Sequence, residues 1–178
     1  MVSRVVDITG ISAVVAALGV LIGVAYYILD MRSQTKIRKT DMLVKLYSRS
    51  TDSEFMDAYW KVLSLDVADY HDYVKKYGAL SSDSPMNRAF FTVVNFYQMA
   101  GALLLRKLID LLTVYDFWGS RNPTMIFEKV KPIVLGLRRE VDPELYKGFE
   151  YFAAELKREE PQLQKTIHEA FAKIPQTS

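Results

Sequence analysis

The chain has 178 residues, of which half are apolar and a quarter are charged, and its formal net charge is only +2. This composition is typical of a single folded domain and excludes a largely disordered chain. Because basic and acidic residues are interspersed, no basic stripe marks a nucleic-acid-binding protein. The lack of cysteine excludes disulfides, thiolate metal sites and cysteine nucleophiles.

An uncharged run covers residues 8–29, between Asp7 and Asp30. As a helix rising about 1.5 Å per residue, it matches the roughly 30 Å hydrocarbon thickness of a bilayer. A cleavable export signal has a shorter apolar region, of about 7 to 15 residues, followed by a small-residue cleavage site. The run therefore predicts a retained transmembrane anchor within residues 1–31.

Basic residues flank this run unequally. Arg4 alone precedes it, whereas several follow closely: Arg32, Lys36, Arg38, Lys39, Lys45 and Arg49. By the positive-inside rule, this asymmetry predicts a single-pass protein of the cell membrane with its N-terminus outside and its C-terminal domain cytoplasmic. Membrane lipid is an expected partner of Arg32, Lys36, Arg38 and Lys39, because cations near the surface attract anionic headgroups. The favoured alternative is that they only set the topology, with no lipid specificity.

Small residues recur along one face of the predicted anchor. Ser12, Ala16, Gly19 and Gly23 follow one another at steps of four, three and four. In a membrane, such a stripe allows a second helix to approach closely. It predicts helix packing with a protein partner or with a second copy of the chain, and the alternative is a smooth side that faces lipid.

The rest of the chain shows helix signals and no sustained alternation of period two. We expect a juxtamembrane helix over residues 32–50, with Leu43, Leu46 and Tyr47 as its apolar stripe, and a cytoplasmic helical domain over residues 51–178. The predicted fold is all-α: an N-terminal transmembrane helix, the juxtamembrane helix and a bundle of about five to six helices.

Caps and prolines predict where the helices of this domain begin and end. One helix should begin at a capping box of Thr51 and Glu54, and a short one should end at Gly78. Another should begin at Ser84 and Pro85, and the next should end at Gly119. The remaining signals are Asn122 with Pro123 and Asp142 with Pro143 as starts, Pro132 as a kink or break, and Pro161 as the start of a last helix.

Residues 89–105 form a second uncharged segment. Its length is at the lower limit for a membrane span, and it carries the polar residues Thr92, Asn95 and Gln98. We favour a buried central helix of the bundle. The alternative is a second span, which would make the protein polytopic.

The run "NFYQMAGALLLRKLIDLLTVYDFWG", followed by "IFEKVKPIVLGLRRE", resembles a family of small prokaryotic membrane-anchored helical proteins of unknown function. The resemblance covers approximately Asn95 to Glu140. It implies an all-helical fold with an N-terminal anchor, and it implies no activity. Position 98 is glutamine here, where the family pattern implies an acidic residue.

One cluster suggests chemistry. Asp66, Asp69, His71 and Asp72 supply oxygen and nitrogen donors of the kind that divalent metals prefer. Their spacing is not that of an EF-hand, and aspartate often caps helices, so we favour capping over a membrane-tethered metal-dependent enzyme. Motifs for phosphate, zinc or nucleophilic catalysis are absent from the sequence. We therefore predict no enzymatic activity, no metal and no cofactor, and the sequence identifies no small-molecule substrate.

Aromatic residues of "VYDFWG" are the candidates for partner binding: Tyr115, Phe117 and Trp118. Such side chains dominate binding hot spots, but they also bury large areas in cores, and core packing with Asp116 exposed is the favoured alternative for Phe117 and Trp118. Together, these features predict a membrane-anchored helical interaction protein with an accessory, scaffolding or regulatory role.

Overall fold

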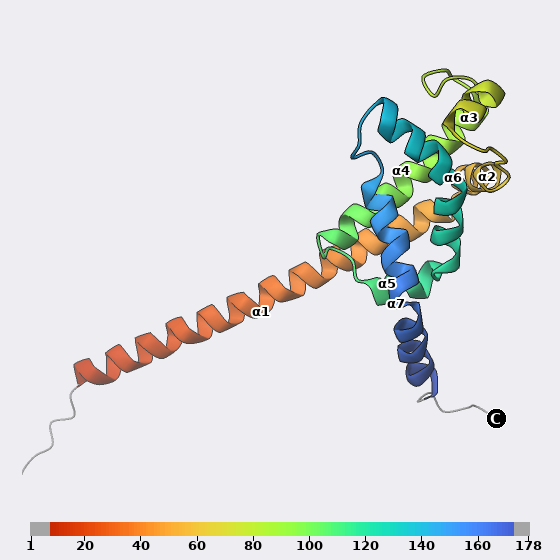
Figure 1. Cartoon of the computed structure of the whole chain (residues 1–178). Coiled ribbons are helices and arrows are strands. Elements are labelled where there is room, and N and C mark those ends of the chain that lie inside the picture. Colours follow the sequence, from red (N-terminus) through yellow and green to blue (C-terminus); the bar gives the residue numbers. More distant parts are fainter. Residues whose placement is uncertain (1–7, 173–178) are drawn as a thin grey trace, which may run out of the picture. The chain divides into compact units, whose positions relative to one another are not determined.

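The structure, a computed structural model, describes residues 8–172, and it describes side chains from residue 18 onward. Over this range it contains seven helices and no strand, which confirms the all-α prediction (Figure 1). The helices are α1 (Ile8–Ser50), α2 (Ser53–Leu63), α3 (Tyr70–Tyr77), α4 (Pro85–Leu105), α5 (Leu111–Trp118), α6 (Arg121–Glu140) and α7 (Lys147–Ala172).

The chain divides within α1 into two compact units, Met1–Met42 and Leu43–Ser178. Helix α1 continues without interruption through residues 32–50, as predicted for the juxtamembrane segment. Its last turns belong to the second unit, where Leu43 and Leu46 are buried while Tyr47 remains exposed. We call this second unit the helical body.

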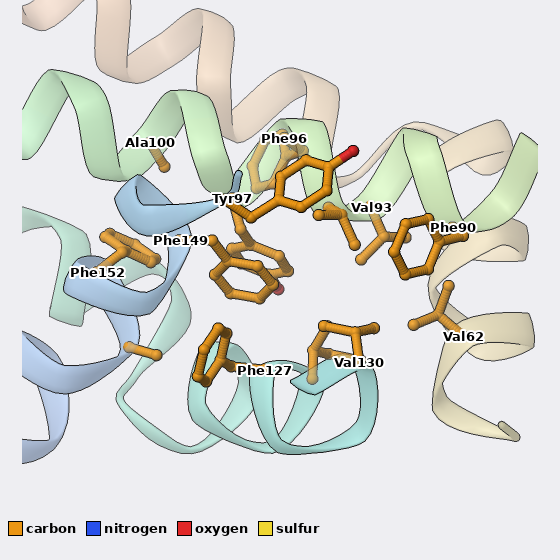
Figure 2. Close-up of a cluster of buried hydrophobic side chains, with 14 of the residues drawn as sticks. Val62, Phe90, Val93, Phe96, Tyr97, Ala100, Phe127, Val130, Phe149 and Phe152 are labelled. Carbon is orange, nitrogen blue, oxygen red and sulfur yellow. The ribbon is translucent and has the colours of Figure 1, made fainter. Parts of the chain in front are cut away.

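Helix α4 forms the centre of the helical body, because it packs against both α2 and α7. Figure 2 shows side chains from α2, α4, α6 and α7 meeting in one apolar cluster. Tyr97 of α4 stacks on Phe149 of α7 with ring centroids 4.8 Å apart, and Phe127 of α6 meets Phe149 edge-on at 5.1 Å. Aromatic pairs of this kind contribute about 0.5–1.5 kcal/mol beyond the area that they bury.

Within the residues that the structure describes, α4 is also the one helix that is long and apolar enough to cross a membrane. Of the apolar 18-residue stretch of α4, 44% is buried within the fold. Its residues Phe90, Val93, Val94 and Ala100 are fully enclosed. This burial is what a central bundle helix requires. It agrees with the favoured prediction for residues 89–105.

Glycine allows α4 and α7 to approach backbone to backbone. A Cβ atom built on Gly101 would lie 1.9 Å from the carbonyl oxygen of Gly148. Beside this contact, Gln98 Oε1 accepts the N–H of Phe149 at 2.9 Å and thus satisfies a donor in the first turn of α7. At position 98 this chain therefore uses a neutral amide as a helix cap.

We expect Gly101→Ala to lower the free energy of unfolding by about 1–3 kcal/mol, because the added methyl group meets backbone that has no rotamer with which to move away. Chemical denaturation followed by the fluorescence of Trp60 and Trp118 measures the change. Gly23→Ala is the control, since no atom lies within 4 Å of its added Cβ. Equal stability of the two variants would contradict the close approach.

Several predicted helix ends are confirmed. Ser84 accepts the N–H of Asn87 at 3.1 Å and caps α4, which begins at Pro85. Gly78 and Gly119 follow α3 and α5 with φ angles of 84° and 65°, a region that favours glycine. These ends depend on residues within a few positions of one another, which is why local sequence was enough to locate them.

The predicted capping box at Thr51 is wrong. Asp52 is the cap of α2, because its carboxylate accepts the N–H of Glu54 at 2.8 Å. The hydroxyl of Thr51 instead donates to the carbonyl oxygens of Tyr47 and Ser48, at 3.2 and 3.1 Å. Helix α1 extends to Ser50, so Thr51 completes its C-terminal turn and is not free to cap the next helix.

Proline breaks fewer helices than the sequence predicts. Helix α6 is not broken at Pro132, and α7 runs through Pro161, so the separate last helix is wrong. An internal proline costs about 3 kcal/mol through its missing hydrogen bond and its ring clash. Around Pro161, burial of Leu156 and Leu163 keeps both halves of α7 against the body and offsets that cost.

The start of α7 is also later than predicted. Asp142 accepts the N–H of Glu144 at 2.9 Å, but this bond closes a turn and does not begin the helix. Tyr146 then adopts a φ angle of 57°, which interrupts the helical path immediately before Lys147. From Phe149 onward, α7 turns one apolar face toward the core, since Phe149, Phe152 and Leu156 are fully buried.

Candidate functional site

The described part of the predicted anchor presents apolar side chains on all sides. Every residue from 18 to 29 is exposed, including Leu21, Ile22 and Tyr26 at 64%, 68% and 73%. We call residues 18–29 the apolar segment. An ordinary surface helix of a soluble domain has one apolar stripe and one polar face, and this segment has no polar face at all.

The predicted helix-packing stripe is open where the structure describes it. No atom lies within 4 Å of a Cβ atom built on Gly19 or on Gly23, so this face has room for another helix. The side chains of Ser12 and Ala16 lie outside the described residues. Helix packing through this stripe stays a prediction.

The predicted membrane-surface residues lie in α1 between the apolar segment and the helical body. Arg32, Lys36, Arg38 and Lys39 are all exposed. Arg49, at the end of the same helix, differs from them because it forms ion pairs with Asp52 at 3.8 Å and Glu54 at 3.4 Å. The exposed cations are therefore available to a charged surface, whereas Arg49 helps to join α1 to α2.

The acidic cluster of the sequence is used for capping. Asp69 accepts the N–H of Asp72 at 2.8 Å and caps α3. Asp72 in turn accepts the N–H of Ala68 at 3.1 Å and pairs with Lys76 Nζ at 3.0 Å, while Asp66 contributes its backbone carbonyl to the same ammonium group at 2.7 Å. Within residues 18–172, no group of three acidic or histidine side chains is arranged to hold a metal ion, and His71 is exposed.

This cap predicts a pH dependence. Hydrogen bonding by Lys76, and then by the backbone N–H of Ala68, lowers the pKa of Asp72 in the folded state. A carboxyl with a lowered pKa stabilises the fold above its unfolded pKa of about 3.9, and this contribution is lost as the pH falls through the folded pKa. We therefore expect Asp72→Asn to lower the free energy of unfolding at neutral pH and to have a diminishing effect below about pH 4.

Denaturation of both proteins over a series of pH values measures this difference. Asp66→Asn is the matched control, because the side chain of Asp66 makes neither of the two bonds. A difference between the native protein and Asp72→Asn that is the same at every pH would contradict the assignment of the cap.

The three candidate partner-binding residues have different environments. Trp118 Nε1 donates to Ser50 Oγ at 2.9 Å, and its ring meets Phe96 edge-on at 5.8 Å, so Trp118 helps to hold α5 against the core. Phe117 is 42% exposed and packs on Tyr47 at 4.9 Å. The favoured alternative of core packing thus describes Trp118 and is wrong for Phe117, and Asp116 is exposed as predicted.

Tyr115 lines a groove that the sequence did not reveal. A cavity of about 500 Å³ lies between α5 and the C-terminal part of α7, with Leu112 and Tyr115 on one side and Ile167 and Phe171 on the other. We call it the α5–α7 groove. Phe171 lines the groove and is 66% exposed. The α5 helix therefore presents Phe117 and the α5–α7 groove to its surroundings.

Comparison with known proteins gives one match. A family model described as "Domain of unknown function (DUF4760)" matches residues 9–156. No curated protein and no solved structure matches the chain. The matched range begins inside α1 and ends inside α7, so it includes the apolar segment and the core of the body and excludes Ile167 and Phe171.

Proposed function

Because this chain belongs to the DUF4760 family, whose description assigns no activity, we propose a function from its own residues. The protein is a single-pass, membrane-anchored helical protein that acts through contacts with other proteins at the inner face of the membrane. Its role is that of an accessory, scaffolding or regulatory component.

The exposure of the apolar segment carries this proposal. A contiguous apolar surface as long as residues 18–29 is rare on soluble proteins and marks contact with a membrane or a partner. A helix is suited to lipid because it satisfies its backbone hydrogen bonds internally. The uncharged run of residues 8–29 also has the length of about 20 residues that a span requires.

Cysteine labelling tests the anchor and its orientation. The chain has no cysteine, so Ser3→Cys and Ser178→Cys each supply a unique thiol. In intact cells, a membrane-impermeant maleimide should label Ser3→Cys only, and Ser178→Cys should react only after the membrane is permeabilised. Labelling of both positions in intact cells, or of Ser178→Cys alone, would refute the proposed topology.

The same method separates a single-pass from a polytopic protein. Ser81 and Arg106 are exposed and lie before and after α4. If α4 is the central helix of a cytoplasmic bundle, Ser81→Cys and Arg106→Cys will be protected in intact cells, like Ser178→Cys. If α4 crosses the membrane, one of the two will be labelled from outside, and the polytopic alternative will replace the proposal.

Half-exposed aromatic side chains around α5 support contact with a protein partner, since such residues are enriched in binding hot spots. A photo-crosslinking amino acid at position 117 or 171 should give a discrete cross-linked product in native membranes. The control is position 135, where Leu135 is 43% exposed on α6. A product of twice the chain mass would identify a second copy as the partner, and identical patterns at all three positions would remove α5 from the proposal.

A further inference from the structure

A pocket distinct from the α5–α7 groove lies within the helical body. Its volume is about 210 Å³, and it is bounded by the end of α1, by α2, α4 and the end of α5, and by the start of α6. Five of its lining side chains are aromatic, namely Phe55, Tyr59, Trp60, Tyr97 and Trp118. We call it the aromatic pocket. It is smaller than the roughly 300–1,000 Å³ of sites for drug-sized ligands, so it suits a small group.

The walls of the aromatic pocket are held in place by contacts among its own lining residues and with Phe96. The rings of Tyr59 and Trp60 are nearly perpendicular, at 84° with centroids 5.4 Å apart, so they form two sides of a corner. The indole of Trp118 is oriented by its hydrogen bond to Ser50 and by its edge-on contact with Phe96. A ligand would therefore meet rings that are already positioned, which reduces the entropy lost on binding.

The chemistry of the lining favours one class of ligand. Among the described residues that line the pocket there is no charged side chain and no leucine, isoleucine or valine; Met56, Ser50 and Asn122 accompany the aromatic rings. Aromatic faces carry partial negative charge and attract weakly hydrated cations. A primary ammonium group has three N–H donors to satisfy and would need a carboxylate or several carbonyl groups. A quaternary ammonium group has no N–H donor, so it needs no such partner.

A polar group also faces the site. Tyr97 lines the pocket and is only 3% exposed, yet its hydroxyl makes no hydrogen bond within the described part of the chain. Among the described residues, the one enclosed side-chain polar atom without a partner is Arg138 Nη2, so the Tyr97 hydroxyl is not sealed off and solvent or a ligand can reach it. A ligand that carries an oxygen near its cationic group, as choline and its esters do, would supply a hydrogen-bond partner.

We propose that the aromatic pocket binds a quaternary ammonium group, either in a small soluble molecule of the choline type or in a lipid headgroup. The rings of Tyr59, Trp60 and Trp118 contact the methylated cation, and the hydroxyl of Tyr97 bonds to the neighbouring oxygen. Trp118 of α5 lines this site, but the partner contacts proposed for Phe117 and Phe171 do not, since neither residue lines the aromatic pocket.

Titration of the full-length protein in a non-ionic maltoside detergent tests the proposal. Choline is the ligand, and 3,3-dimethyl-1-butanol is its uncharged control with nearly the same shape. The chain has only two tryptophans, Trp60 and Trp118, and both line the pocket, so intrinsic fluorescence reports on binding. We expect a saturable change with choline and at least tenfold weaker binding of the alcohol. Equal binding of the two, or no binding of choline, would overturn the proposal.

Substitution of Trp60 locates the site. Trp60 is 58% exposed, so Trp60→Leu should fold normally and weaken choline binding about five- to tenfold, whereas Trp60→Phe should retain most of it. Phe171→Leu is the matched control, because it removes an exposed aromatic side chain outside the aromatic pocket. If Trp60→Leu binds choline as the native protein does, the assignment of the pocket is wrong.

Reconstitution separates the two sources of the ligand. In nanodiscs that contain phosphatidylcholine, a headgroup in the pocket would compete with added choline and raise its apparent dissociation constant. Nanodiscs of phosphatidylglycerol alone provide the reference. Competition would assign the site to lipid, and an unchanged dissociation constant would assign it to a soluble molecule.

Discussion

Leu18→Asp combined with Ile22→Asp is expected to move the full-length protein out of the membrane fraction. Both residues lie in the apolar segment and are exposed, so these substitutions disturb no packing within the described part of the chain. An aspartate near the centre of a membrane helix costs about 2.5–3.5 kcal/mol. Two together cost about 5–7 kcal/mol, which corresponds to a shift in partitioning of roughly four orders of magnitude.

Fractionation after an alkaline wash, followed by quantification of the protein in the pellet and the supernatant, measures this shift. Leu135→Asp combined with Val141→Asp is the matched control, since it adds the same charge at exposed apolar positions of the helical body. The control should remain in the membrane. If the variant with Leu18→Asp and Ile22→Asp also remains in the membrane fraction, residues 8–29 do not anchor the protein. Helix α4 is then the candidate membrane-spanning helix.

Phe149→Ala should have the largest effect on stability. The ring of Phe149 is fully buried, stacks on Tyr97 and meets Phe127 edge-on, so three helices of the body share this contact (Figure 2). Removal of a buried phenylalanine ring typically costs about 3–5 kcal/mol, through the lost transfer free energy and the cavity that remains. This is a large fraction of the roughly 5–15 kcal/mol that stabilises an ordinary domain.

Denaturation followed by tryptophan fluorescence should show a transition at much lower denaturant concentration, or a body that is unfolded without denaturant. Phe171→Ala provides the comparison, because the same side chain is removed from an exposed position of the same helix. Its effect should stay within about 0.5 kcal/mol. Similar losses in both variants would show that α7 does not pack on α4 through Phe149.

The chain belongs to a family of unknown function, as the resemblance implied, and the matched range is considerably longer than the segment that carried the resemblance. The recognised segment covers Asn95 to Glu140, from the middle of α4 to the end of α6, whereas the family model extends over residues 9–156. Aromatic-rich helices are distinctive in sequence, while the apolar run of residues 8–29 is not, because any apolar anchor has a similar composition.

The candidate interaction surfaces were only partly predictable. Three aromatic residues within four positions of one another have different environments. Tyr115 lines a groove, Phe117 is half exposed, and Trp118 joins the core. Helical spacing gives the direction in which a side chain points, but it does not give the neighbour that covers it. The aromatic pocket was not predicted at all, since its lining comes from five helices and no sequence motif connects them.

Local chemistry along the chain was enough to predict the all-α class, the caps at Ser84 and Asp69, and the helix ends at Gly78 and Gly119. Each of these depends on the backbone and side chains within one turn of helix. Packing between distant helices was needed for the continuity of α7 through Pro161 and for the close approach at Gly101. There, burial against residues far away in the chain outweighs a local preference of a few kcal/mol, and no short stretch of sequence contains that information.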